Sequence, residues 1–412
     1  MNNISYFCIV KRFTSILRFV FFCLAFLSFG QAKASPDTSL ISDEELDSVR
    51  ISLLTCSPHE EIYSLYGHTA IRVENPARGM DLAVNYGMFS FAKPHFVLRF
   101  VFGLTDYEMG MVPFPYFCAE YRSYGSKVTQ QVINLNSEQK KRIMRALDEN
   151  YKPENRVYRY NYFYDNCTTR ARDIIFKHLQ DDKHQIIGKS YTDEKTFREM
   201  VRACCAHHPW LQFGNDILLG LKADRPTTND EQEFLPANLM NDIDEMLISD
   251  NSTYEAPLVI DKFTVVEPGV QTVEEGFPLR PRTCAIILLV VSLLVFVMER
   301  VNKTIYWGFD LLLMLLSGLA GIVLFVMLFS QHPTVSLNLQ LLALNPLPLF
   351  FAYAAVRRTR NHKGGFWWWK LWALFLVLFF IGASVQSYAE GMMLVACCLL
   401  LRCISHIFFE KA

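Results

Sequence analysis

The sequence has almost no net charge, because its 40 Lys and Arg residues nearly balance its 41 Asp and Glu residues. It also has no basic stripe, no internal repeat and no low-complexity tract. A protein that binds nucleic acid needs a basic surface to meet the phosphates, so we exclude nucleic acid as a partner. Charged residues are also unevenly distributed: they are frequent from about Ser35 to Arg282 and sparse after Arg282. The 412 residues therefore divide into a soluble domain and a membrane domain.

Residues 1–34 have the pattern of a signal peptide. Lys11 and Arg12 come before the apolar run "FVFFCLAFLSFG", and Ala32 and Ala34 form an A-x-A cleavage pattern. The alternative is an uncleaved N-terminal anchor. In either case we expect the next domain to be delivered to the periplasm.

The last part of the sequence contains five apolar runs, each close to the ~20 residues that cross a bilayer. The first and third loops between them carry Lys and Arg, whereas the second and fourth, "SQHPT" and "QSYAEG", carry none. By the positive-inside rule this predicts a multi-pass protein of the inner membrane, with the C-terminus in the cytoplasm. The run "GGFWWWKLW" is interpreted as an aromatic interfacial belt. The expected spans are 284–298, 306–329, 337–356, 370–387 and 391–408.

The soluble segment, 35–250, mixes two hydrophobic periods. Alternating residues predict strands, and a period of 3.6 with capping residues predicts helices. The mixture indicates an α+β fold of antiparallel strands with helices at either end, followed by an all-α membrane domain at 284–412. Residues 251–283 are expected to form a strand or two and a linker. We expect strands at 49–56, 63–75, 81–91, 95–114, 125–135 and 156–166, and helices at 137–151, 167–179, 195–205 and 210–221.

Cys167 stands where an aromatic strand turns into a helix, in "NYFYDNCTTRARDIIF". Asp165 or Asn166 can cap that helix, which places Cys167 in its first turn. There the free N–H groups and the helix dipole favour a thiolate, the nucleophilic form of cysteine. The helix start, at Asn166 and Thr168, can also supply an oxyanion hole. The alternative is a small buried residue that packs the helix against the sheet.

His68, in "LYGHTAIRV", is the candidate base, because a histidine in the middle of a strand can point at a helix start packed across the sheet. Cys-His catalysis also needs a third group that fixes the imidazole ring. Asn85 on the adjoining strand is the best candidate for this role, and Asp81 is a weaker one. A structural histidine is the alternative.

The exported domain has five cysteines, and an odd number in an oxidising compartment leaves at least one unpaired. Cys56 and Cys118 are one candidate disulfide among several pairings. The run "ACCAHHPW" lacks the spacing of metal ligands, so we expect neither a metal nor a cofactor. Asp224, Arg225, Glu231 and Glu233 are expected to form ion pairs rather than to act in catalysis.

The blocks "YGHTAIRV" and "YNYFYDNCTTRARD" resemble those of circularly permuted papain-like domains, such as the NlpC-like and lecithin:retinol acyltransferase-like enzymes. In that arrangement the histidine strand comes before an Asn-Cys at a helix start. More closely, the chain resembles the Lnb-type bacterial lipoprotein N-acyltransferases, which also have "GNDILLGLKADRP" and "FLPANL" blocks and membrane helices. The resemblance covers about 50–410 and implies His68 and Cys167 as the catalytic pair. It does not fix a third member.

The resemblance implies an acyltransferase. A phospholipid would be the acyl donor, a Cys thioester the intermediate, and the N-terminal amine of a diacylglyceryl-cysteine lipoprotein the acceptor. Tyr66 and Tyr164 are candidates for substrate binding, as are Asn338 and Asn345 in the third span, where a re-entrant kink is the alternative. The apolar stretch 89–117 either lines an acyl tunnel or forms core strands. Two other functions stay open: a membrane-tethered cysteine peptidase or amidase of the cell wall, and a non-catalytic membrane assembly factor.

Overall fold

Residues Ser42–Ala412 form one compact unit of the computed structural model. The signal peptide expected at 1–34 lies outside the described residues. The structure describes residues 43–61, 64–89, 95–180, 184–188, 194–249, 255–271 and 276–409.

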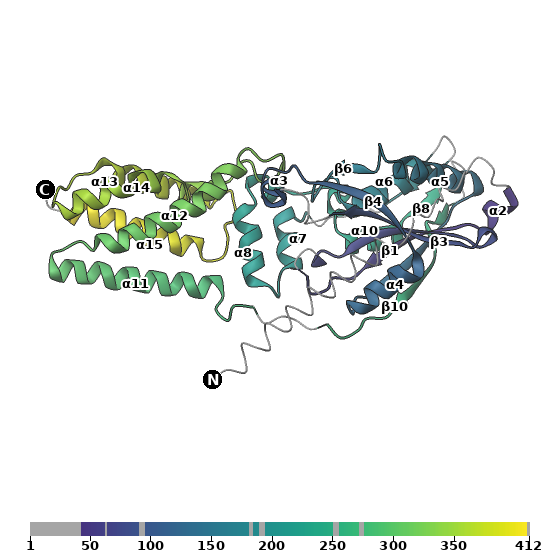
Figure 1. Ribbon diagram of the computed structural model, residues 1–412, viewed down its shortest axis with the longest axis horizontal. Helices are drawn as coiled ribbons and strands as arrows, with labels where there is room; N and C mark the ends of the chain where they lie inside the picture. The colour runs from purple at the N-terminus through teal and green to yellow at the C-terminus, as the bar shows by residue number, and fades with distance from the viewer. Residues whose placement is uncertain are drawn as a thin grey trace. The chain divides into compact units, whose positions relative to one another are not determined.

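A seven-stranded antiparallel sheet organises the N-terminal part of this unit (Figure 1). Its strand order is β10-β5-β1-β2-β3-β4-β6, which puts the histidine strand β2 at its centre. Strands β1 and β5 are buried along almost their whole length, because helices cover both faces of the sheet. The strands are β1 (Arg50–Cys56), β2 (His68–Asn75), β3 (Met80–Met88), β4 (Asp106–Pro113), β5 (Val128–Ile133), β6 (Val157–Arg159) and β10 (Val259–Val266).

Two helices position the candidate site against this sheet. Helix α6 (Cys167–Leu179) packs on β2 and β3 and is backed by α5 (Ser137–Tyr151). Helix α4 (Phe114–Ser123) covers the other face, where Phe114 and Phe117 join a core with Leu54 and Ala70. Both α5 and α6 begin in a capping box, and the N-cap of α6 is Asn166, one of the two residues predicted to cap it.

The remaining short elements frame these layers. Strands β7 (Gln185–Ile187), β8 (Leu247–Ser249) and β9 (Glu255–Pro257) form a separate three-stranded sheet. The other helices are α2 (Asp43–Ser48), η3 (Pro76–Arg78), α3 (Phe96–Val101), α7 (Phe197–Cys204), α8 (Pro209–Leu218), η4 (Leu221–Asp224), α9 (Asn229–Gln232) and α10 (Pro236–Glu245).

Three predicted strands differ from the structure. The strand predicted at 63–75 starts only at His68, because residues 64–66 form a turn closed by the bond from Gly67 N–H to the Ser64 carbonyl. The strand predicted at 156–166 ends at Arg159, and the Asn161–Asp165 bridge then reverses the chain before α6. The strand predicted at 95–114 divides into α3 and β4, and Gly103, with φ +68°, ends the helical part.

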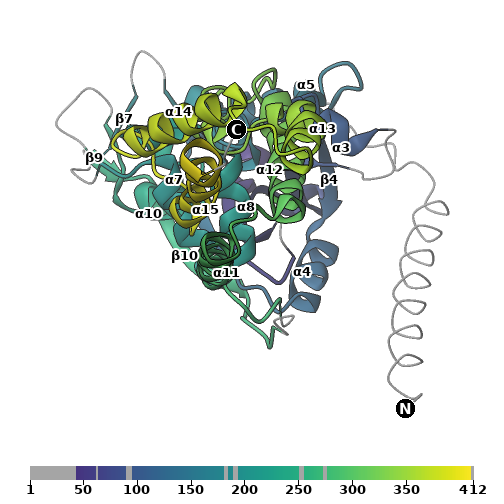
Figure 2. The same ribbon diagram turned by 90° about the vertical axis from the view of Figure 1, so that its left-hand side faces the viewer.

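The C-terminal part is helical, with five α-helices among the described residues (Figure 2). Three runs in it are long and apolar enough to cross a membrane, and the last two helices are shorter. The third predicted span is broken, because a 3-10 turn precedes its α-helix. The elements are α11 (Pro281–Asn302), α12 (Trp307–Met327), η5 (Leu339–Leu342), α13 (Leu347–Arg360), α14 (Trp367–Gly382), α15 (Met392–Ile404) and the π-helical turn η6 (Ser405–Phe409).

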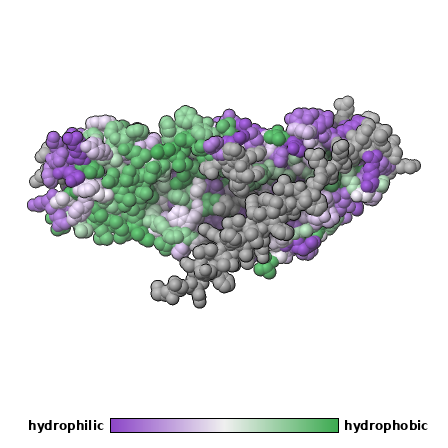
Figure 3. All heavy atoms as spheres, in the orientation of Figure 1, coloured by the Kyte–Doolittle hydropathy of each residue, from purple (hydrophilic) through white to green (hydrophobic). Residues whose placement is uncertain are grey.

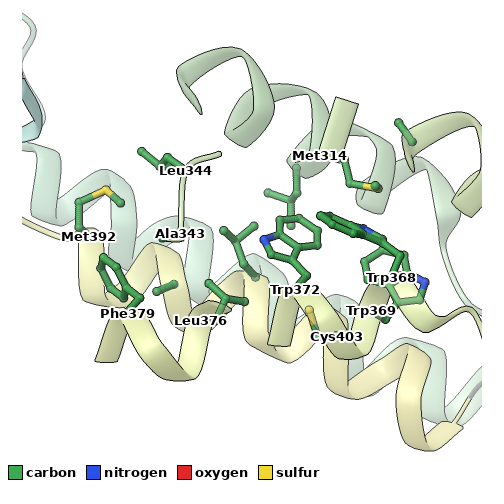
Figure 4. Close-up of a cluster of buried hydrophobic side chains, with 14 of the residues drawn as sticks. Met314, Ala343, Leu344, Trp368, Trp369, Trp372, Leu376, Phe379, Met392 and Cys403 are labelled. Atoms are coloured by element: carbon green, nitrogen blue, oxygen red, sulfur yellow. The ribbon is translucent and has the colours of Figure 1, made fainter. Parts of the chain in front are cut away.

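The outer surface of these helices is predominantly apolar (Figure 3), as a lipid-facing surface requires. Their core is aromatic: Trp368, Trp369 and Trp372 are fully buried and pack with Leu376 and Phe379 (Figure 4). The prediction of an aromatic belt for this run was therefore wrong for these three tryptophans, which fill the bundle instead of facing the interface.

Backbone hydrogen bonds join the two parts. The N–H of Gly220 donates to the carbonyl of Thr334 at 2.8 Å, and that of Leu221 donates to the carbonyl of Leu337 at 2.6 Å. Near the sheet, Gln331 N–H donates to the carbonyl of Phe102, beside α3, at 2.9 Å. The loop before η5 is thus held by both α8–η4 and α3.

Candidate active site

The site begins at the N-terminus of α6, where Asn166 is the N-cap residue. Its Oδ1 accepts the backbone N–H groups of Thr168 and Thr169, each at 2.9 Å. The Thr169 hydroxyl accepts the N–H of Asn166 at 2.8 Å, which completes a capping box. Asn166 Nδ2 donates to the carbonyl of Phe234 at 2.9 Å. These bonds fix the first turn of the helix, in which Cys167 is the first residue.

His68 is the first residue of β2 and lies on the same face of the sheet as Asn85. Ala70 pairs with Asn85 across β2 and β3, and residues two apart on a strand share a face. His68 Nε2 lies 3.0 Å from Asn85 Oδ1, which is the contact that the sequence predicted. The imidazole also lies close enough to the Cys167 thiol for each group to shift the pKa of the other.

One aromatic ring packs against the imidazole, and Asp81 does not contribute to its surroundings. The ring of Tyr121 on α4 is stacked with that of His68, with 6.4 Å between centroids and 10° between planes. Asp81, the weaker candidate for orienting His68, instead forms a bidentate ion pair with Arg72, both distances being 2.8 Å. Asn85 is therefore the side chain that orients the ring.

The electrostatics favour an ion pair between the thiol and the imidazole. Burial raises the pKa of Cys167, but the charge of His68, its hydrogen bond, and bonds from Thr69 N–H and Thr168 bring that pKa below the ordinary value. Burial lowers the pKa of His68, but the charge of Cys167, their hydrogen bond and the Asn85 bond raise it overall. The two shifts have the signs of a thiolate facing an imidazolium.

The helix start offers fewer oxyanion donors than we expected. The N–H of Thr168 is bonded to Asn166 Oδ1, and the Thr168 hydroxyl receives a bond from the Thr69 hydroxyl at 3.1 Å. Asn166 donates its own N–H to Thr169. Because these groups already have partners inside the cap, the backbone around Asn166 and Thr168 does not present a ready pair of donors.

The two tyrosines predicted to bind substrate have different surroundings. Tyr66 is half-buried, and its hydroxyl accepts a bond from Asn215 Nδ2 at 2.9 Å and lies 3.6 Å from Cys205 Sγ. Tyr164 is 41% exposed, and its hydroxyl accepts a bond from Arg225 at 3.1 Å. Only Tyr164 therefore presents much of its side chain to solvent.

Asn338 and Asn345 are both buried and hydrogen bonded within the chain. Asn338 Nδ2 donates to the carbonyl of Ile217 on α8 at 2.7 Å, and Asn338 Oδ1 accepts from Gln386 at 2.9 Å. Asn345 Oδ1 accepts the N–H of Leu347, the first residue of α13, at 3.2 Å. Both side chains have structural partners, one at the junction with α8 and one at the start of a helix.

The five cysteines of the N-terminal part are all free. Cys56 and Cys118 belong to one core cluster without being bonded, so the candidate disulfide between them is absent. Burial raises the pKa of the Cys56 and Cys118 thiols, opposite to the direction at Cys167. Cys167 thus differs from them in the direction of its pKa shift.

The four charged residues expected to form ion pairs do so. Arg225 pairs with Glu231. Asp224 accepts from Arg198 at 2.8 Å, and Glu233 accepts from Arg172 at 3.0 Å. The sequence predicted these acidic residues as ion-pair partners but not the buried Arg198 and the half-buried Arg172 that hold two of them. The set consists of Arg172, Arg198, Asp224, Arg225, Glu231 and Glu233.

A buried charge cluster in the helical part was missed. Arg402 on α15 donates to both carboxylate oxygens of Glu299 at 2.6 and 2.8 Å and to Asp310 at 2.7 Å. His406 lies 2.9 Å from the other Asp310 oxygen and is stacked on Trp369 at 3.9 Å. The sequence signal that could have indicated this cluster is the presence of ionisable residues inside apolar runs. The cluster joins α11, α12 and α15.

The fold and site define a membrane protein with a mixed α/β sheet domain, in which a cysteine at a helix start meets a histidine from a strand. Comparison with protein families finds two matches: the Lnb N-terminal periplasmic domain over residues 39–189 and the Lnb transmembrane domain over residues 272–412. The chain belongs to the Lnb family, whose members are in general acyltransferases acting on lipoprotein and lipid substrates at the membrane. Comparisons with curated proteins and with solved structures gave no match.

The family match supports the predicted organisation, a periplasmic domain followed by membrane-spanning helices in an inner-membrane protein. Both matched ranges contain parts of the structure described above. The first includes His68, Asn85 and Cys167, and the second includes all five helices α11–α15.

Proposed function

We propose that the chain is a lipoprotein N-acyltransferase that works through a thioester on Cys167. The observation that carries the proposal is the arrangement at the sheet: His68 is held by Asn85 at 3.0 Å, and the Cys167 thiol at the start of α6 lies close enough for the imidazole to lower its pKa. This arrangement has the three parts that Cys-His nucleophilic catalysis needs, namely a nucleophile, a base and a group that orients the base.

In the first half-reaction the Cys167 thiolate attacks the carbonyl carbon of a phospholipid ester. The carbonyl electron pair moves to oxygen and returns as the ester C–O bond breaks. The imidazolium of His68 gives its proton to the departing alkoxide, so a lysophospholipid leaves and an acyl thioester remains. Asn85 keeps the ring in the orientation that this transfer requires.

In the second half-reaction the N-terminal amine of a diacylglyceryl-cysteine lipoprotein attacks the thioester. Neutral His68 takes the proton that the nitrogen loses as the amide forms, and the Cys167 thiolate is released. An amine attacks a thioester readily, so the acyl group ends on nitrogen and the enzyme returns to its starting state.

The surroundings of the thiol support a lipid donor. The Tyr160 ring lies next to Cys167 and 5.4 Å from the Tyr162 ring, which in turn lies 5.2 Å from that of His332, in the loop before η5. Two aromatic rings therefore connect the site to the periplasmic ends of the membrane helices. In the proposed topology these ends lie at the level of the outer leaflet, where the ester of the donor is found, and the C-terminus is cytoplasmic.

The acceptor can be tested with purified full chain in phospholipid vesicles and a synthetic peptide that begins with diacylglyceryl-cysteine. The proposal predicts a peptide heavier by one acyl chain, with the addition on the α-amine. The same peptide with an acetylated α-amine is the control and should gain nothing. Release of free fatty acid without acylated peptide, or cleavage of cell-wall peptides, would instead identify a hydrolase and overturn the proposal.

A further inference from the structure

The hydroxyl of Tyr158, on β6, is buried without a hydrogen-bond partner. The side chain is 8% exposed, and among the described residues none accepts from or donates to its oxygen. A buried hydroxyl that is left unpaired costs about 1–3 kcal/mol, so such groups are rare in folded proteins unless a ligand completes them. This hydroxyl also lies close enough to Cys167 for the thiolate charge to act on it.

An irregularity in β3 puts a glycine, Gly87, beside both that hydroxyl and the cysteine. The pairing of β3 with β4 shifts register between Asn85 and Met88, and Gly87 between them has φ +86°. A Cβ placed on Gly87 would lie 3.6 Å from Cys167 Cβ and 3.8 Å from Tyr158 Oη. The hydroxyl of Tyr158 and the side chain of Cys167 therefore border the same point beside Gly87, which has no side chain to separate them.

The Tyr158 phenol is kept neutral and polarised. Burial, followed by the charge of Cys167, raises the pKa of Tyr158 far above its ordinary value, so the oxygen keeps its proton and can donate it in a hydrogen bond. The guanidinium of Arg170 lies 3.4 Å from the centroid of the Tyr158 ring and is itself held by Asp165. A cation over the ring draws electron density from the phenol, which strengthens its O–H as a donor.

We propose that Tyr158 is the oxyanion donor of the acyl transfer, with the substrate carbonyl oxygen bound between Cys167 and the Tyr158 hydroxyl. As Cys167 attacks, the carbonyl π pair moves onto this oxygen, and the Tyr158 O–H donates a hydrogen bond to it without transferring the proton. The bond is released when the tetrahedral centre collapses to the thioester. The inference rests on the proposed function and supplies the donor that the occupied cap of α6 lacks.

The test measures the rate of thioester formation on the full chain in vesicles of diacyl phosphatidylethanolamine. Tyr158→Phe removes one oxygen and keeps the ring under Arg170, so folding should be unchanged. Loss of an oxyanion donor typically lowers the rate by about 10²–10³-fold, and we expect a decrease of this order in the maximal rate with little change in the half-saturating lipid concentration. Tyr86→Phe removes the other unpartnered phenol hydroxyl of the sheet and is the matched control, expected within about threefold of the parent.

Alkylation of Cys167 by iodoacetamide provides the second readout. It requires the thiolate but no oxyanion, so Tyr158→Phe should react at the parent rate. A Tyr158→Phe chain that forms the thioester as fast as the parent would overturn the inference alone. A parent chain that is alkylated but forms no thioester would overturn the proposed function, and a variant that loses alkylation as well would show a structural role for Tyr158.

Discussion

At the scale of single residues, we expect Asn85 to control how the site responds to pH. Its bond to Nε2 raises the pKa of His68, and the protonated imidazole in turn lowers the pKa of Cys167. Both shifts favour an ion pair, whose population we expect to increase as pH rises through the lowered thiol pKa and to decrease as pH rises through the raised imidazole pKa.

Asn85→Ala removes one of the bonds that hold the proton on His68. The pKa of His68 should fall and that of Cys167 should rise, so the pH range of the ion pair narrows from both ends. We expect alkylation of Cys167 at neutral pH to slow by about 10-fold, the effect of one pKa unit on a minor thiolate fraction. The measurement is the pH profile of iodoacetamide reactivity. An unchanged profile would mean that Asn85 does not act on the pair.

Three residues of the site could be predicted from the sequence because their chemistry is unusual where they stand. Cysteine at a helix start, histidine within a strand and asparagine on the neighbouring strand each had a specific interpretation, and the structure brings Cys167, His68 and Asn85 together. Tyr158 could not be singled out, because it stands in a stretch rich in tyrosine and phenylalanine, where nothing in the sequence tells a donor from a packing residue.

At the scale of elements, the cap of α6 both holds the helix and aims the thiol. Two helices of the domain start with the same device, an Asn N-cap in a capping box: Asn166 before α6 and Asn136 before α5. Only Asn166 adjoins Cys167. A comparison of the two caps therefore separates the effect of a cap on stability from its effect on the reactivity of the thiol.

Asn166→Ala and Asn136→Ala should each lower the free energy of unfolding by about 1–2 kcal/mol, the usual cost of losing an N-cap. Asn166→Ala should in addition slow alkylation and acylation of Cys167, because the first turn no longer holds the sulfur against His68. Thermal unfolding and thiol alkylation are measured on both variants. Equal reactivity of Cys167 in the two would contradict a role of the cap in positioning.

Elements with strong local signals were predicted, and elements set by tertiary contacts were not. Helices α5 and α6 matched their predicted ranges because their capping boxes are encoded locally. Residues 96–101 were predicted as strand, yet they form α3, where Arg99 bonds the carbonyl of Leu104 and the carboxylate of Asp106. Asp106 is the first residue of the next strand, β4, so its bond to Arg99 depends on how the chain folds back and not on the periodicity of residues 96–101.

At the scale of the whole molecule, polar side chains hold the membrane helices to α8 of the catalytic part. Gln340 in η5 donates to the carbonyl of Asp216 at 2.8 Å and accepts the N–H of Ala389 at 3.0 Å. Arg202 pairs with Asp216 and donates to the carbonyl of Tyr388 at 3.0 Å. The polar residues of the third span, which break that helix, thus serve to dock the periplasmic part.

At the other end of the helical part, a buried group of ion pairs joins α11, α12 and α15. Arg402 lies between Glu299 and Asp310, all three almost completely buried. Removing one partner of such a group leaves an uncompensated charge, which typically costs about 3–5 kcal/mol. The bundle is therefore fixed at two levels, by amide bonds at η5 and by this cluster, and it can present a rigid support to the thiol.

The measurement that tests the central claim most directly is the mass of Cys167 in the full chain after incubation with phospholipid vesicles. The account predicts a mass increase of one acyl chain on Cys167, lost on treatment with hydroxylamine, absent in Cys167→Ala and strongly reduced in His68→Ala. An unmodified Cys167 in a chain whose thiol still reacts with iodoacetamide would contradict it.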